Sequence, residues 1–195
     1  SRIVLEALGE SDFGIFTLAG SLIAFFSVLN TTMSSSIQRF LSYYIGSDDI
    51  SCYNETINAG IRIHYYIALI ILLLAETVGL WIFYNYLNIP LDRKVASHFV
   101  YQFSLLATIA TIVGIPYTGL VIAWERMDFF AYLALIEVSV KLIIAFVVKY
   151  CSNDKLILYS GLYFLATVIP VIITYYYCRI NFNMPRFKKV SFKSL

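Results

Sequence analysis

Residues Ile63 to Ile89 have the sequence IHYYIALIILLLAETVGLWIFYNYLNI and contain a single formally charged residue, Glu76. A helix needs about 20 consecutive, mainly apolar residues to cross the hydrocarbon core of a bilayer, so this stretch is long enough to span it. The whole chain has the same character. Of its 195 residues 60% are hydrophobic and 13% are charged, whereas ordinary soluble domains contain roughly 25% charged residues. We therefore predict an all-α membrane protein.

Four further apolar stretches are long enough to cross a membrane, and short polar or charged breaks separate them. The five predicted spans are 14–43, 63–89, 99–124, 129–148 and 156–178. Because no break can hold a folded domain, we predict one polytopic helical bundle over residues 1–180 and a basic linker over 181–195. The segment from Ser1 to Phe13 looks like the end of a preceding helix. We therefore expect the chain to be a fragment of a longer protein.

Lysine and arginine residues divide unequally between the two sides when consecutive spans alternate in direction. One side has Arg39, Arg62, Arg126, Arg179, Arg186, Lys188, Lys189 and Lys193, and the other has Arg2, Arg93, Lys94, Lys149 and Lys155. Cytoplasmic loops of membrane proteins carry the excess of these residues. We therefore predict that the first side, with the segment 181–195, is cytoplasmic and that the turn 88–94 is external.

Polar side chains recur at helical spacing on three spans, as is typical of helix faces turned toward protein or water. The stripes are Thr17, Ser21, Ser27, Thr31, Ser34, Ser35, Gln38 and Ser42 in the first span, Ser104, Thr108, Thr111 and Thr118 in the third, and Tyr159, Tyr163, Thr167, Pro170 and Thr174 in the fifth. Two interpretations stay open, close packing of helices or an internal cavity. The cavity interpretation predicts a shared interior for Thr31, Ser35, Thr108 and Thr167, with Leu73 and Ile144 outside it.

Charged residues at membrane depth are the candidate functional residues, because an ionised side chain there costs roughly 3 kcal/mol. Glu137 and Lys141 are four residues apart and can pair on one helix face, so they either neutralise one another or line a pathway. Glu76 either is protonated and bonded to a neighbouring helix or exchanges a coupling ion. Arg39, beside Gln38 at the end of the first span, either binds phosphate or extends to the membrane surface.

Sequence motifs of enzymes and metal sites are missing. The chain has no H-E-x-x-H, no G-x-S-x-G and no Gly-rich phosphate loop, and its three cysteines have no C-x-x-C spacing. We therefore expect no enzyme activity, no metal site and no cofactor. The net charge of +2 gives no reason to expect nucleic acid as a partner.

Several short stretches carry a resemblance to a known family. They are RIVLEALG (residues 2–9), DFGIF (12–16), MSSSIQRF (33–40), AETVGLW (75–81), IPY (115–117) and WERM (124–127). Together they resemble the amino-terminal lobe of Wzx-type O-antigen and capsule flippases, which are polysaccharide biosynthesis proteins of the multidrug/oligosaccharidyl-lipid/polysaccharide exporter superfamily. The resemblance extends over essentially the whole chain, although its motifs are diffuse.

The resemblance implies helices two to six of a six-helix lobe, in a transporter with two lobes and about twelve helices in the bacterial inner membrane. Its substrate would be a lipid-linked oligosaccharide on undecaprenyl diphosphate, moved between leaflets by alternating access among membrane lipids. Arg39, Lys141 and Gln38 are then the substrate-binding candidates. Glu76 and Glu137 depart from a cationic cavity and are the candidates for coupling to H⁺ or Na⁺.

Two alternatives remain beside the flippase. A cation-coupled multidrug exporter of the same superfamily would export cationic dyes. A non-transporting membrane component of glycan assembly would not move substrate at all. A glycan polymerase is disfavoured, because it would be expected to have a large external loop and the breaks here are short.

Overall fold

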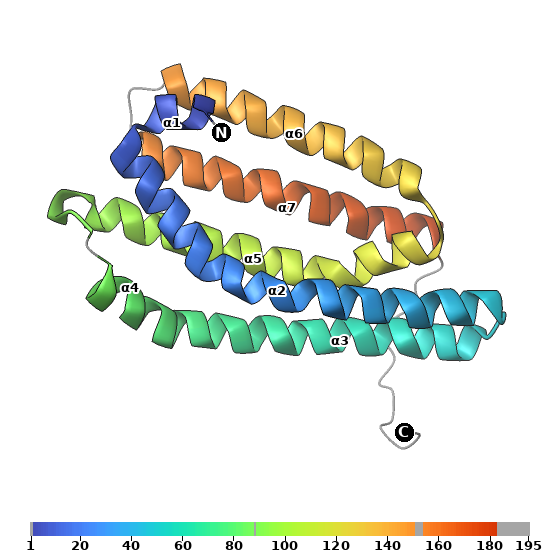
Figure 1. Ribbon diagram of the computed structural model, residues 1–195. Helices are drawn as coiled ribbons and strands as arrows, with labels where there is room; N and C mark the ends of the chain where they lie inside the picture. The colour runs from blue at the N-terminus through green and yellow to red at the C-terminus, as the bar shows by residue number, and fades with distance from the viewer. Residues whose placement is uncertain (1, 88, 151–153, 183–195) are drawn as a thin grey trace.

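The computed structural model describes residues 2–87, 89–150 and 154–182, and the side chains of residues 2, 3 and 22–33 are outside that description. Over the described residues the chain forms helices and short connections and no strand. Its elements are α1 (Arg2–Leu8), α2 (Glu10–Gly46), α3 (Ile50–Leu74), the π-helical turn η1 (Ala75–Gly79), α4 (Leu80–Tyr86), the 3-10 turn η2 (Leu91–Arg93), α5 (Lys94–Ala123), α6 (Met127–Tyr150) and α7 (Lys155–Asn181). The long helices lie side by side in one elongated bundle (Figure 1).

Four helical segments of the described chain are long and apolar enough to cross a membrane: Ile50–Tyr86, Leu91–Ala123, Met127–Tyr150 and Lys155–Asn181. The prediction of an all-α polytopic membrane protein is therefore confirmed. The four segments contain or closely match the predicted spans from 63–89 onward. The first predicted span, 14–43, falls inside α2, whose central side chains are outside the description.

Two helices begin before the predicted membrane spans that they contain. The second spanning helix begins at Ile50, ahead of residue 63 where the predicted span starts, because the Asp49 side chain accepts a hydrogen bond from the backbone N–H of Cys52 and so caps the helix start. Helix α2 begins at Glu10, since the break after α1 is confined to Gly9, whose φ of 84° suits a residue without a side chain. Both helices are thus longer than hydrophobicity alone indicates.

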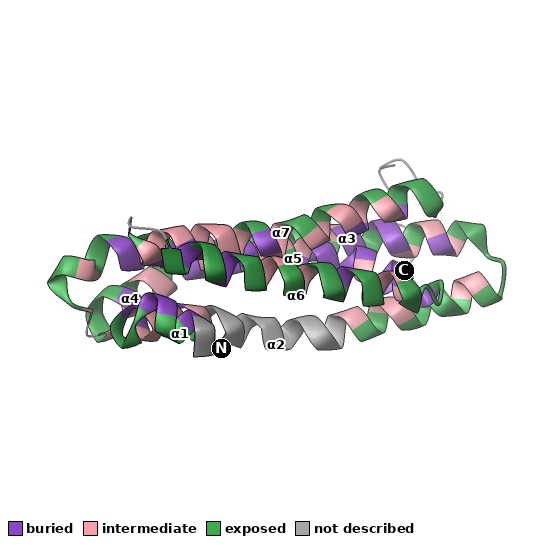
Figure 2. Ribbon diagram, turned by 90° about the horizontal axis from the view of Figure 1, so that it is seen from above, coloured by how far each residue is buried: buried purple, intermediate pink, exposed green. Residues whose placement is uncertain are grey.

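Helix α5 is the centre of the bundle. It packs against α2, α3 and α7, and Val100, Leu105, Ile112 and Leu120 along its length have no exposed surface. Helix α6 packs only against α7 and α1 among the stronger helix pairs, and most of its surface is exposed (Figure 2). Its exposed residues include Leu135, Val138, Ile143 and Phe146, as expected for a helix that faces lipid or further protein.

We infer two membrane levels along the bundle from exposed tyrosines, because Tyr and Trp concentrate at the two membrane–water interfaces. Tyr66 and Tyr86 on the α3–α4 segment are 67% and 70% exposed, and Tyr132 and Tyr150 on α6 are 68% and 83% exposed. At 1.5 Å per residue the first pair is about 30 Å apart and the second about 27 Å. Both separations match a hydrocarbon core of about 30 Å.

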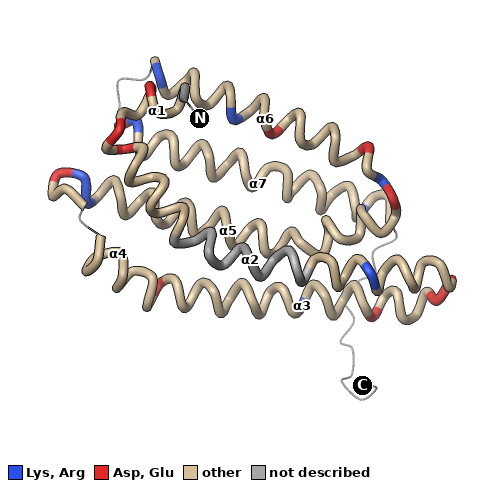
Figure 3. Tube along the Cα trace, viewed as in Figure 1, with Lys and Arg blue, Asp and Glu red and all other residues tan. Residues whose placement is uncertain are grey.

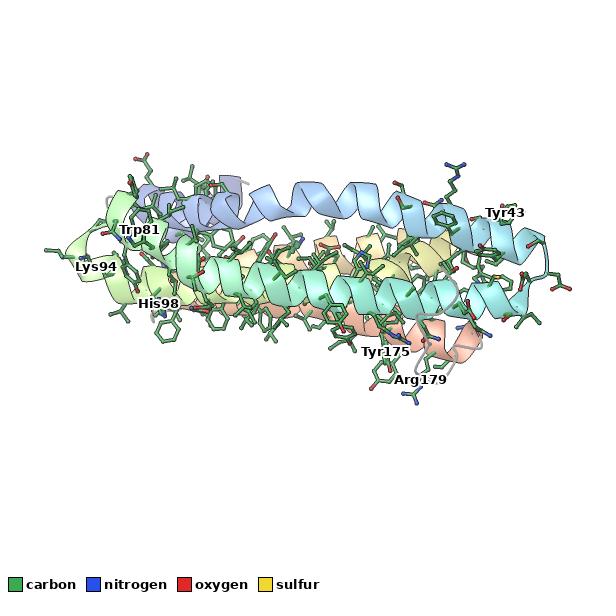
Figure 4. The ribbon with its side chains drawn as sticks, turned by 90° about the horizontal axis from the view of Figure 1, so that it is seen from below. Tyr43, Trp81, Lys94, His98, Tyr175 and Arg179 are labelled. Carbon is green, nitrogen blue, oxygen red and sulfur yellow. The ribbon has the colours of Figure 1, made fainter. Side chains whose placement is uncertain are left out.

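Other aromatic and basic side chains agree with these two levels. Figure 4 shows Trp81, Lys94 and His98 at one end of the bundle and Tyr43, Tyr175 and Arg179 at the opposite end. The end with Trp81 is the predicted external end, and the end with Tyr43 is the predicted cytoplasmic end. The hairpin of α2 and α3 extends past the α5–α6 turn at the predicted cytoplasmic end (Figure 1).

Six threonines of the polar stripes are bonded within their own helices. Thr17, Thr108, Thr111, Thr118, Thr167 and Thr174 each donate a hydrogen bond to the carbonyl oxygen four residues earlier. Such bonds remove the need for water or a partner helix, so these stripes do not require a cavity.

The predicted division between interior and exterior residues holds only in part. Thr31 and Ser27 have side chains outside the described part of the chain. Thr108 and Thr167 are half-buried, Ser35 is exposed, and Leu73 is 58% exposed, as expected for an outward residue. Ile144 contradicts the prediction. It is 7% exposed and packs in a cluster with residues of α1 and α7.

Candidate functional site

Charged residues gather toward the two ends of the bundle, and α6 carries an acidic and a basic residue part-way along its length (Figure 3). Lys141 lies nine positions from both Tyr132 and Tyr150, and Glu76 lies ten positions from both Tyr66 and Tyr86. Both residues are therefore midway between the interfaces marked by the exposed tyrosines. Each needs a partner, because an isolated ionised group at this depth is costly.

Glu76 lies in the π-helical turn Ala75–Gly79, which interrupts an otherwise continuous helix from Ile50 to Tyr86. In this turn the N–H of Leu80 bonds to the carbonyl of Ala75, five residues earlier. A π-turn inserts one extra residue into the helical path, and such turns are frequent at functional sites. The turn was not predicted from the sequence.

Tyr101 of α5 fits against this turn. Its hydroxyl donates a 2.7 Å hydrogen bond to the Ala75 carbonyl oxygen, and its side chain is almost fully buried beside Phe83. Gly79 makes the approach possible, because a Cβ atom at that position would lie 2.3 Å from the Tyr101 hydroxyl oxygen. The π-turn, the glycine and the tyrosine thus form one interlocked unit.

Glu76 itself is bonded by the next residue of α5. The amide Nε2 of Gln102 donates to the Glu76 carboxylate over 3.4 Å. An amide has both a donor and an acceptor group, so Gln102 can donate to an ionised carboxylate and, after its amide turns over, accept from a protonated one. This arrangement can stabilise Glu76 in both protonation states.

Glu137 and Lys141 form the predicted ion pair along one face of α6. The Lys141 ammonium also lies 5.2 Å from the centre of the Tyr163 ring on α7, close enough for a cation–π contact. The side chains of Lys141 and Glu137 remain 35% and 39% exposed. Pairing lowers the cost of burying these charges, and their remaining exposure leaves both able to contact a ligand.

Arg39 and Gln38 lie apart from these two sites. Arg39 is exposed on α2 one helical turn before Tyr43, which places its guanidinium near the predicted cytoplasmic interface. Gln38 is half-buried, and its backbone nitrogen is near Gly119 of α5. No contact among the described residues joins Arg39 or Gln38 to Lys141, so the predicted substrate-binding residues do not form one site within this bundle.

An ion network ties three helices together at the predicted external end. The Arg93 guanidinium contacts Asp12 at 3.1 Å and Asp154 at 3.3 Å, so it joins the starts of α2, α5 and α7. Burial raises the pKa of the Asp12 carboxyl above its ordinary value of 3.8. Arg93 opposes this shift, and the nearby Asp154 and Asp92 add to it. One arginine therefore balances more than one carboxylate at this end.

The sequence contained a signal for only part of the Glu76 site. Gln102 is a polar residue inside an apolar span, as Glu76 is, and two such residues on adjacent spans could have been paired. Nothing in the sequence marks Tyr101 as more than an apolar residue, since its role depends on the fit of its hydroxyl over Gly79.

Among the described residues, no group of three His, Cys, Asp or Glu side chains could hold a metal ion.

Comparison with protein-family models, with curated proteins and with solved structures finds no match for this chain.

Proposed function

We propose that this chain is part of a transporter that moves lipid-linked oligosaccharide across the bacterial cytoplasmic membrane by alternating access, with Glu76 as the residue that couples transport to an ion gradient. The observation that carries the proposal is the Glu76 site. It combines a carboxylate midway between the two interfaces, a π-turn in its helix and one amide partner on the neighbouring helix.

A purely structural role explains this combination poorly. An apolar residue at position 76 would pack without the cost of a carboxylate in hydrocarbon, and π-turns are rare except at functional sites. A coupling carboxylate, in contrast, must gain and lose a cation at membrane depth. The amide of Gln102 supports such an exchange because it can bond to either state of the carboxyl group.

The glycan substrate rests on the resemblance to Wzx-type flippases, and on Lys141 as a cationic group midway through the membrane. Lys141 suits an anionic diphosphate, and its partial exposure leaves it able to contact one. The proposal predicts that Lys141→Ala lowers the glycan export per molecule of protein in the membrane and that Lys141→Arg retains part of that export.

The test of the coupling role is the dependence of glycan export on the ion gradient in cells that require the protein. Glu76→Gln keeps the size and hydrogen-bonding capacity of the side chain but cannot ionise, so export should continue with weaker gradient dependence. Glu55→Gln is the matched control, because Glu55 is exposed on the part of α3 that extends beyond Tyr66. Gradient dependence in Glu76→Gln equal to that of the unmodified protein would refute the coupling role.

The same carboxylate site also suits a cation-coupled exporter of organic cations, which is the alternative within transport. Dye efflux separates the two functions. An exporter of this kind would extrude cationic dyes and leave glycan export unchanged when the protein is removed, whereas the flippase proposal predicts loss of glycan export and no change in dye efflux. Loss of neither would favour a non-transporting role.

A further inference from the structure

A cavity of about 580 Å³ opens at the predicted cytoplasmic end, where the projecting α2–α3 hairpin meets the ends of α5 and α7. It lies beyond the Tyr132 level, because one of its walls is Trp124, in the turn that precedes α6. This places the cavity in the headgroup region or the adjacent water, well away from Glu76. Its volume falls in the range of about 300–1,000 Å³ typical of small-molecule sites.

The walls of the cavity are aromatic and held in place by contacts with one another. The ring of Trp124 stacks on Phe182 with centroids 5.4 Å apart and an interplanar angle of 12°. The indole N–H of Trp124 donates to the Tyr53 hydroxyl over 3.1 Å. Tyr53 and Phe182 are buried, but Trp124 is 42% exposed. The cavity therefore has a fixed, flat aromatic surface that a ligand can reach.

Besides the hydroxyl-bearing Tyr44 and Tyr53, the polar residues of the cavity are two amides, Asn54 and Asn181, and one carboxylate, Asp48. Each amide offers both a donor and an acceptor. A hydroxyl group does the same, so a ring bearing several hydroxyls can use both functions of an amide. The Asn181 amide nitrogen already donates to the Tyr177 carbonyl oxygen over 3.0 Å, which leaves its amide oxygen as an acceptor. An organic cation would use the carboxylate and leave the Asn54 amide donor to water.

We propose that this cavity binds a sugar ring, with one apolar face of the ring on Trp124 and its hydroxyl groups on Asn54 and Asn181. A pyranose has this combination of C–H faces and equatorial hydroxyls, and its C–H groups pack favourably on aromatic rings. The inference rests on the proposed function only for the source of the sugar, which would be the glycan head of the lipid-linked substrate at the cytoplasmic surface. The binding itself is independent of transport.

The chain provides its own reporter for the test. Its two tryptophans are Trp81 and Trp124, and Trp81 lies on α4 toward the other end of the bundle (Figure 4). Trp81→Phe therefore leaves Trp124 as the only tryptophan. The full chain is placed in nanodiscs, because glycoside detergents would themselves supply sugar rings. Four ligands are titrated separately: maltose, N-acetylglucosamine, tetramethylammonium and a peptide of residues 183–195. The same measurement with a glycolipid in the nanodisc distinguishes membrane-borne sugar from free sugar.

We expect a saturable change in Trp124 fluorescence with at least one saccharide, half-complete at a concentration on the order of 1 mM. Asn54→Ala should raise that concentration roughly 3- to 10-fold through loss of one hydrogen bond. Glu55→Ala, next to it but outside the cavity lining, should leave it unchanged. Asp48→Asn should also leave sugar binding nearly unchanged, because an amide still bonds to hydroxyls and Asn tolerates the φ of 56° at this position.

Three results would overturn the inference. The first is no saturation with any saccharide. The second is saturation by tetramethylammonium that Asp48→Asn abolishes, which would identify a cation site. The third is saturation by the peptide alone, which would mean that the cavity receives the chain's own basic segment. Sugar binding that persists while Glu76→Gln has no effect on gradient dependence would refute the coupling role and leave the sugar site standing.

Discussion

The contact between Gly79 and Tyr101 allows a sharp test of the Glu76 site, because the two residues should be strongly coupled. A Cβ atom added at Gly79 would lie 2.3 Å from the Tyr101 hydroxyl oxygen but 3.5 Å from the ring carbon that carries it. The first distance is impossible and the second is an ordinary van der Waals contact. Gly79→Ala should therefore be harmful with tyrosine at position 101 and tolerated with phenylalanine.

The expected magnitudes follow from this geometry. Tyr101 is 1% exposed and cannot move aside freely, so Gly79→Ala should cost about 1–3 kcal/mol from overpacking. Gly79→Ala should also break the hydrogen bond from the Tyr101 hydroxyl to the Ala75 carbonyl, which is worth about 1 kcal/mol. Tyr101→Phe should cost about 1 kcal/mol, since the Ala75 carbonyl keeps its bond from the Leu80 N–H. The double variant should cost no more than Tyr101→Phe, a departure from additivity of roughly 2–4 kcal/mol.

The free energy of unfolding can be measured by titration with a denaturing detergent in mixed micelles, for both single variants and the double variant. Gly14→Ala is the matched control, because a Cβ atom there would have no neighbour within 4 Å, and its cost should stay within about 0.5 kcal/mol. If Gly79→Ala costs the same with tyrosine as with phenylalanine at position 101, the Tyr101 hydroxyl does not occupy the space over the π-turn.

Three further predictions concern the charges and the orientation. Lys141→Leu should lower protein abundance because it leaves Glu137 unpaired, whereas replacing both residues by Leu should restore abundance to the original level or higher. Quantitative blotting would measure the abundance of each variant. Equal abundance in the single and the double variant would argue against a stabilising pair. The folded-state pKa of Asp12 is raised, so its contribution to stability is present below pH 3.8 and lost as pH rises through that raised pKa. Thermal denaturation of Asp12→Asn should lack this part of the pH dependence, and an unchanged pH profile would contradict it. In a background without the native cysteines, an impermeant thiol reagent applied to intact cells should label a cysteine at Leu91 but not at Leu195, and the reverse pattern would overturn the predicted orientation.

The sequence by itself determined the fold class and the approximate position of four membrane-spanning helices. Apolar stretches of about 20 residues have few alternatives to a membrane helix, because every backbone polar group must be bonded inside the segment. The ion pair of Glu137 and Lys141 was predictable for a similar reason, since residues four apart on a helix are neighbours wherever the helix is placed.

Interactions between helices were decided only by the tertiary structure. The bond from Gln102 to Glu76, the fit of Tyr101 over Gly79 and the cavity beside Trp124 each join residues far apart in the sequence. They depend on the rotation and depth of one helix relative to another, which hydrophobicity does not specify because lipid-facing and protein-facing surfaces are both apolar. For the same reason, the inward position of Ile144 and the bonding of the threonine stripes to their own backbones could not be foreseen from composition or spacing.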